Sequence, residues 1–107
     1  MKGSPVNTLP ADFDSFAARA GEVASMLKAL GNRARLMVLC KLVERGEMRV
    51  GELAGEVGLS QSALSQHLAK MRDENLVAFR RDGQSLFYSV ADQRCEALLA
   101  TLHRLYC

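Results

Sequence analysis

Two helix-forming segments joined by a three-residue turn constrain the fold more than any other feature of this sequence. The spacing of apolar residues predicts helices over residues 50–57 and 61–74, separated by Gly58-Leu59-Ser60. Gly58 suits the end of a helix, and Ser60 suits the cap that begins the next one. Two helices connected by so short a turn cross at a steep angle, which predicts a helix-turn-helix.

A predicted β-hairpin follows this helix pair. Residues 76–81 and 85–90 are rich in β-branched and aromatic side chains, and Asp82-Gly83 between them favours a two-residue hairpin loop. Helical spacing also predicts helices over residues 13–30 and 33–45 and a last helix that Asp92 can cap. The predicted fold is therefore mainly α with a β-hairpin wing: four helices, two strands and a closing helix, which is a winged helix-turn-helix.

The chain of 107 residues is long enough for one domain. Residues 1–10, which contain both prolines, are expected to form a flexible N-terminal tail, and residues 11–107 the domain itself. No apolar run approaches the roughly 20 residues that cross a bilayer, and the first residues lack an apolar signal core. We therefore expect a cytoplasmic protein without a membrane partner.

The helix predicted over residues 61–74 has two different faces. A helical wheel places Leu64, Leu68 and Met71 on one side, and Ser62, Ser65, Gln66 and Ala69 on the other. Small side chains and uncharged donors and acceptors suit a helix that reads base edges in the major groove of DNA. The alternative is that these residues only solvate a surface helix.

The hairpin favours the DNA-binding interpretation because Arg80 and Arg81 flank its tip and can reach backbone phosphates. Phosphate contacts of this kind position a protein on the duplex, while the helix supplies the selectivity. The formal net charge of +2 adds little to this argument.

Four segments resemble the ArsR family of small dimeric bacterial repressors: residues 50–54 (VGELA), 59–68 (LSQSALSQHL), 75–77 (NLV) and 81–88 (RDGQSLFY). The likeness covers about residues 20–107. It implies a homodimer built from the first and last helices, bound to double-stranded operator DNA with an imperfect inverted repeat. The family's DNA contacts fall on the positions of Gln61, Ser62, Ser65 and Gln66, three of which the helical wheel selects independently.

A physical argument also favours dimerisation. Both terminal helices carry apolar stripes, the last one through Cys95, Leu99 and Leu102 to Tyr106, and together they exceed what one small core absorbs. A two-fold dimer would set two recognition helices about 34 Å apart, one turn of DNA. The alternative is that both stripes complete the core of a monomer.

The ligands of the two metal sites common in this family are missing from the sequence. The family's thiolate site needs Cys-x-Cys near residues 48–53, where no cysteine stands. Its site on the last helix needs Asp-x-His, but Asp92 is followed by Arg94 at the second position. We therefore expect neither a metal nor another cofactor.

The cysteines suggest a different signal. Lys41 beside Cys40, and His103 and Arg104 before Cys107, could favour the reactive thiolate. The Leu-Cys pair at residues 39–40 and the ending LHRLYC resemble the sulfide- and persulfide-responsive branch of the family. The resemblance implies that persulfides or polysulfides bridge Cys40 and Cys107 through extra sulfur atoms and that DNA is then released. Cys95 is interpreted as a packed small hydrophobe.

Other functions remain as alternatives. An enzyme is not expected, because the chain shows no Ser/His/Asp or Cys/His set, no glycine-rich phosphate loop and no Cys-x-x-Cys. A repressor of the same fold could instead respond to peroxide, through a simple disulfide, or to a metalloid. A winged helix that makes only protein contacts is the rival from another class.

Overall fold

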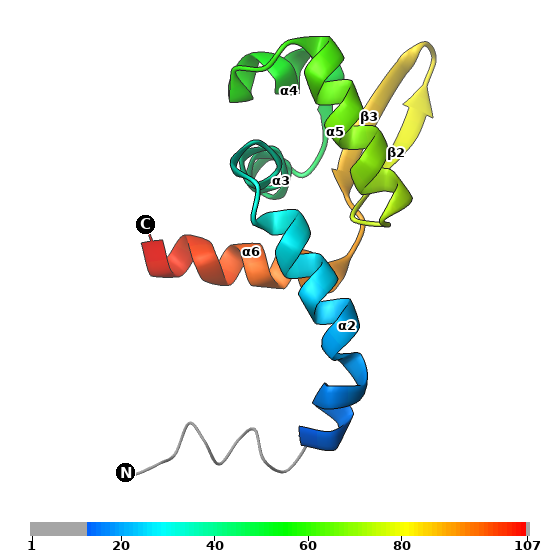
Figure 1. The fold of residues 1–107 in the computed structure, drawn as a ribbon. Helices are drawn as coiled ribbons and strands as arrows, with labels where there is room; N and C mark the ends of the chain where they lie inside the picture. Colours follow the sequence, from blue (N-terminus) through cyan, green and yellow to red (C-terminus); the bar gives the residue numbers. More distant parts are fainter. Residues whose placement is uncertain (1–12, 107) are drawn as a thin grey trace.

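The computed structural model describes residues 13–106, and the tail expected at residues 1–10 lies outside this range (Figure 1). The described elements are α2 (Phe13–Leu30), α3 (Arg33–Arg45), β1 (Met48–Arg49), α4 (Val50–Val57), α5 (Gln61–Asp73), β2 (Val77–Asp82), β3 (Ser85–Val90) and α6 (Gln93–Tyr106). Their order confirms the winged helix-turn-helix fold. None of the helices within residues 13–106 is both long and apolar enough to cross a membrane.

Polar side chains begin three of the helices: the predicted caps Ser60 and Asp92, and Asn32, which was not predicted as a cap. Asn32 Oδ1 accepts a hydrogen bond from the backbone N–H of Arg35 at the start of α3. Ser60 Oγ accepts one from Ala63 at the start of α5, and Asp92 Oδ1 accepts one from Arg94 at the start of α6. Each cap satisfies a backbone donor that has no partner inside its helix, which makes these boundaries predictable.

The hairpin turn lies one residue later than predicted. Asp82 is still part of β2 and pairs with Ser85, so the two loop residues are Gly83-Gln84 and not Asp82-Gly83. Gly83 has a φ of 64°, and glycine enters this region without the steric cost that a side chain imposes. The tight turn thus uses the expected glycine, but at its first central position.

Strand β1 was not predicted. It pairs antiparallel with β3, and the resulting sheet has the order β1-β3-β2. Two residues are too few to show the alternation that identifies a strand in a sequence. Because only Gly46 and Glu47 separate β1 from α3, the sheet of the wing is connected directly to the end of α3.

The core lies where α3, α4, α5 and the start of α6 meet. Leu64, Leu68 and Met71 are fully buried, so the predicted apolar side of α5 is confirmed. The largest of the other fully buried side chains are Leu39, Leu42, Met48, Leu53 and Leu99. This packing holds α5 by one face and leaves its opposite face to solvent.

Helix α2 projects away from the rest of the molecule (Figure 1). Only its last two residues, Ala29 and Leu30, are buried, while Phe13 is 61% exposed and Phe16 is 53% exposed. The radius of gyration is 16.1 Å, against about 13 Å for a compact domain of this length. The apolar stripe of α2 therefore does not complete the core of a monomer.

The core packing of α5 predicts a large difference between two substitutions on the same helix. Replacing buried Leu68 with Ala should lower the free energy of unfolding by about 2–5 kcal/mol, because it leaves a cavity. Replacing exposed Lys70 with Ala should change it by less than about 0.5 kcal/mol. Urea unfolding at one fixed protein concentration measures both, and equal losses would contradict the described packing.

Candidate DNA interface and thiol groove

The face of α5 opposite the core is small, polar and open to solvent. Ser62, Ser65 and Gln66 are all exposed along it, as the helical wheel predicts. The helix starts from the Ser60 cap after Gly58, whose left-handed backbone ends α4. Because the turn is short and the other side of α5 is buried, this face is presented as one rigid surface.

Gln61 is oriented differently from the other three candidate DNA contacts. Its side-chain Nε2 lies 3.4 Å from the point that a Cβ on Gly51 would occupy. The amide of Gln61 thus lies over the first turn of α4 and spans the two helices of the helix-turn-helix motif. The helical wheel places this residue at the flank of the polar face, in agreement with that position.

The two wing arginines have different surroundings. The Arg80 guanidinium donates two hydrogen bonds to the Glu47 carboxylate, Nε to Oε2 at 2.7 Å and Nη2 to Oε1 at 2.9 Å. It also lies 4.6 Å from the centre of the Phe87 ring. These hydrogen bonds hold the pKa of the Glu47 carboxyl below its usual value. The charge of Arg80 is therefore largely balanced inside the protein.

Arg81 is better placed to meet a phosphate. Neighbouring residues of a strand point to opposite faces, so Arg81 shares the face of Phe79. The Phe79 ring lies 5.2 Å from the guanidinium carbon of Arg72, which belongs to the last turn of α5. Among the described residues no ion pair of Arg81 is observed, and this places an unbalanced cation on the α5 side of the wing.

Cys40 lies half-buried in a groove between α3 and α6. The groove has a volume of about 360 Å³. Val43 and Glu44 line it from α3, and Leu99, Ala100, His103 and Arg104 from α6. Cys40 therefore faces the C-terminal half of α6, while Cys107 itself lies outside the described residues.

The charged groups near the groove partly balance one another. Lys41 Nζ lies 2.8 Å from Glu44 Oε1 and 3.5 Å from Glu56 Oε1, so its charge is engaged by two carboxylates. The Lys41 hydrogen bond, with a smaller effect of His103, lowers the pKa of Glu44. Arg104 Nη2 donates to Thr101 Oγ1 at 3.1 Å and is otherwise exposed. Among the residues that line the groove, the guanidinium of Arg104 on α6 is the cation that no carboxylate of the described residues engages.

Cys95 is part of the core. It is fully buried at the start of α6, and burial above all, with smaller effects of Asp92 and Cys40, raises its thiol pKa to about 11. A buried neutral thiol is a poor nucleophile. This environment agrees with the interpretation of Cys95 as a packing residue.

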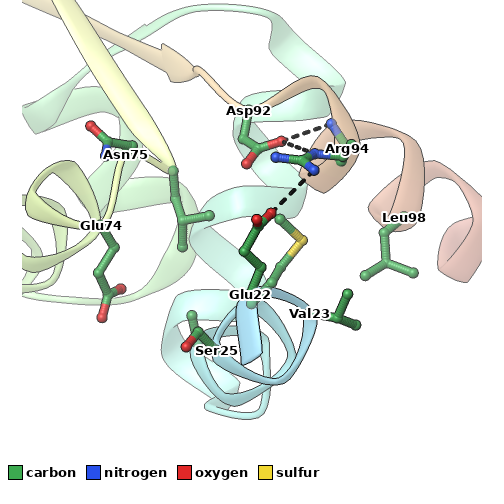
Figure 2. A pocket seen from close by; sticks show the side chains of 11 residues that line it. Glu22, Val23, Ser25, Glu74, Asn75, Asp92, Arg94 and Leu98 are labelled. Atoms are coloured by element: carbon green, nitrogen blue, oxygen red, sulfur yellow. Dashed lines mark hydrogen bonds and ion pairs between the residues drawn. The ribbon is translucent and has the colours of Figure 1, made fainter. Parts of the chain in front are cut away.

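A larger cavity, of about 650 Å³, lies between α2 and the start of α6 (Figure 2). Arg94 lines it, with its Nη1 3.3 Å from Glu22 Oε1 and its Nε 3.8 Å from Asp92 Oδ1. In the family that the sequence resembles, metal-binding members need a histidine at the position of Arg94. Here the Arg94 guanidinium neutralises the two carboxylates instead. Within residues 13–106 no three His, Cys, Asp or Glu side chains gather as metal ligands do.

Known proteins resemble this chain in both sequence and structure. The profile of bacterial regulatory proteins of the arsR family matches residues 32–78. The transcriptional activator HlyU of Vibrio cholerae is 42% identical over 107 residues, 100% of this chain and 94% of that protein. The structure of reduced HlyU superposes with a TM-score of 0.80 at 42% identity, covering 87% of this chain and 97% of that one. The transcriptional repressor BigR of Xylella fastidiosa superposes with a TM-score of 0.81 at 38% identity, covering 88% and 95%.

The environment of Cys95 predicts slow alkylation in the folded protein. A rise of the pKa from 9.0 to about 11 disfavours the thiolate, so below pH 9 the folded state holds about 100-fold less thiolate than the unfolded state. At pH 8, Cys95 should react with iodoacetamide at least 100-fold more slowly in the folded protein than in urea. Peptide mass spectrometry measures this rate, and equal rates in both states would contradict the buried position.

Proposed function

Because the chain belongs to the ArsR family of bacterial regulatory proteins, we propose that it is a dimeric repressor which releases its operator when a persulfide bridges Cys40 and Cys107. Membership makes it a DNA-binding transcriptional regulator and not an enzyme. The observation that carries the sensing part is the position of Cys40, in a groove against the C-terminal half of α6. Cys107 follows that half of the helix directly in the sequence.

The DNA-binding surface combines α5 with the wing. Ser62, Ser65 and Gln66 contact base edges in the major groove, and Gln61 helps to hold α5 against α4 while reaching the same site. Arg81 contacts a phosphate from the wing. Arg80 contributes mainly by fixing the wing to Glu47, and it can reach phosphate only by giving up part of that ion pair.

A second copy of the chain covers the exposed apolar stripes of the terminal helices. Phe13, Phe16 and Leu27 project from α2, and Leu105 and Tyr106 from the end of α6. Large apolar patches of this kind on a small protein mark an interface. A two-fold axis there places two α5 helices about 34 Å apart, which matches an inverted repeat read from one side of DNA in the cytoplasm.

The bridge requires no oxidant besides the persulfide. Two thiols and two molecules of RSSH give one trisulfide between Cys40 and Cys107, two RSH and one H₂S, so that sulfur, hydrogen and electrons balance. One of the two transferred sulfane sulfurs stays as the middle atom of the trisulfide, and the other takes up the two electrons from the thiols and leaves as H₂S. A plain disulfide needs Cα atoms within about 7 Å, whereas an inserted sulfur spans a wider gap, which gives a basis for preferring persulfide over peroxide.

Release of DNA follows from where the bridge is attached. It joins α3 to the segment after α6, and α3 leads through Gly46 and Glu47 into β1 and the wing. A shift of α3 relative to α6 therefore moves both the dimer helices and the wing. The free energy of binding to specific DNA exceeds that of binding to non-specific DNA by roughly 4–10 kcal/mol. A small change in the distance between the two recognition helices removes part of that difference.

Substitutions in α5 and the wing should affect DNA binding differently. Gln66→Ala should weaken binding by about 1–3 kcal/mol to a duplex that the protein selects from a random pool, and hardly at all to a scrambled duplex. Arg81→Gln should weaken both and reduce the salt dependence by about one ion per protomer. Fluorescence anisotropy across a salt series measures this, and salt-independent or absent binding would favour a protein-binding winged helix instead.

Treatment with glutathione persulfide should add sulfur to the protein and abolish operator binding. Intact mass spectrometry should show a Cys40–Cys107 bridge with inserted sulfur in the wild type and in Cys95→Ala, but in neither Cys40→Ser nor Cys107→Ser. Treatment of the protein with peroxide in parallel should leave operator binding intact. A simple disulfide formed by peroxide, together with release of the operator, would establish the peroxide-responsive alternative.

A further inference from the structure

We infer that the groove between α3 and α6 binds the carrier of the persulfide and prefers carriers with a carboxylate, which Arg104 recognises. This inference rests on the proposed persulfide function and names the class of its ligand. The groove joins three features: a half-buried thiol at Cys40, an apolar wall and cationic or hydrogen-donating groups on α6.

The size and walls of the groove suit a small organic molecule. Its volume of about 360 Å³ lies at the lower end of the range of ligand sites, roughly 300–1,000 Å³. Val43, Leu99 and Ala100 form its apolar part, against which the carbon chain of a carrier can pack. A hydrosulfide ion would leave nearly all of this space unused.

The charges favour an anionic group at the α6 side. Glu44 is the acidic residue of the groove lining, and Lys41 balances it at 2.8 Å. Arg104 donates one hydrogen bond to the Thr101 hydroxyl. A guanidinium has five N–H donors, so further donors remain for a second acceptor. Its planar fork matches the two oxygens of a carboxylate, and His103 supplies a further ring nitrogen beside it.

The carboxylate contact orients the persulfide toward Cys40. The Cys40 thiolate attacks the outer sulfur of RSSH, the S–S bond of the carrier breaks, and the electron pair leaves on RS⁻. The proton stays on the transferred sulfur, so the product is the Cys40 persulfide. Thiols built on cysteine carry a carboxylate a few bonds from sulfur, so one carrier can present both groups to the groove, which Cys40 and Arg104 line together.

Two probes that differ only in charge test this inference. N-acetylcysteine persulfide carries a carboxylate, and the persulfide of N-acetylcysteine amide replaces it with a neutral amide. We expect Cys40 in the full-length protein to gain sulfur about three- to fivefold faster from the carboxylate probe, the size expected of one exposed ion pair. Rates are followed by quenched peptide mass spectrometry, and each is divided by the probe's rate with a free cysteine peptide.

Arg104→Gln should bring the ratio of the two corrected rates to about one without changing the rate of the amide probe, which also shows that the variant is folded. Arg104→Lys should keep part of the preference, and Arg94→Gln, a control on the same helix outside the groove, should keep all of it. A wild-type ratio of one, or a ratio that Arg104→Gln leaves unchanged, overturns the carboxylate preference alone. Failure of both probes to modify Cys40 overturns the proposed persulfide function and this inference with it.

Discussion

The burial of α3 is the constraint on which the rest of the structure depends. Val38, Leu39 and Leu42 are completely buried, and α3 packs against α2, α4, α6 and the sheet. Because the interior is close-packed, none of these neighbours can shift without a response from α3. The helix that carries Cys40 is thus also the helix that sets the positions of the recognition motif and the terminal helices. In the proposed function, a bond formed at the Cys40 thiol therefore moves α3 and the elements packed against it.

Electrostatics connect the same helix to the wing. The Arg80–Glu47 pair has bidentate geometry and joins β2 to the two-residue link between α3 and β1. Exposed ion pairs contribute little to stability, so this pair matters for where it holds the wing more than for the energy it adds. It also distinguishes the two wing arginines, since Arg80 is paired with Glu47 within the protein, whereas in the proposed function Arg81 contacts a phosphate. In the proposed function, sensing and DNA binding therefore both depend on α3 and its link to the wing.

The sequence predicts local elements well and long-range partners poorly. Helices α5 and α6 are predictable because Ser60 and Asp92 provide caps and the apolar spacing continues behind them, while α3 is predicted from its apolar spacing alone. The buried and exposed faces of α5 follow from the same spacing. Strand β1 is too short to produce a pattern, and the turn at Gly83 is displaced by one residue because pairing of Asp82 with Ser85 extends the ladder. The partner of Arg80 lies 33 residues away, beyond the reach of any local rule.

By itself, the sequence determined the order of the elements, the polar face of α5 and the cysteines available for chemistry, because each depends on residue types at short and regular spacings. Only the tertiary structure decided that Cys40 opens into a groove with Arg104 and that Lys41 is engaged by two glutamates. The physical reason is that charge balance and solvent access depend on which surfaces meet in space. Those meetings are set by packing across helices that are far apart along the chain.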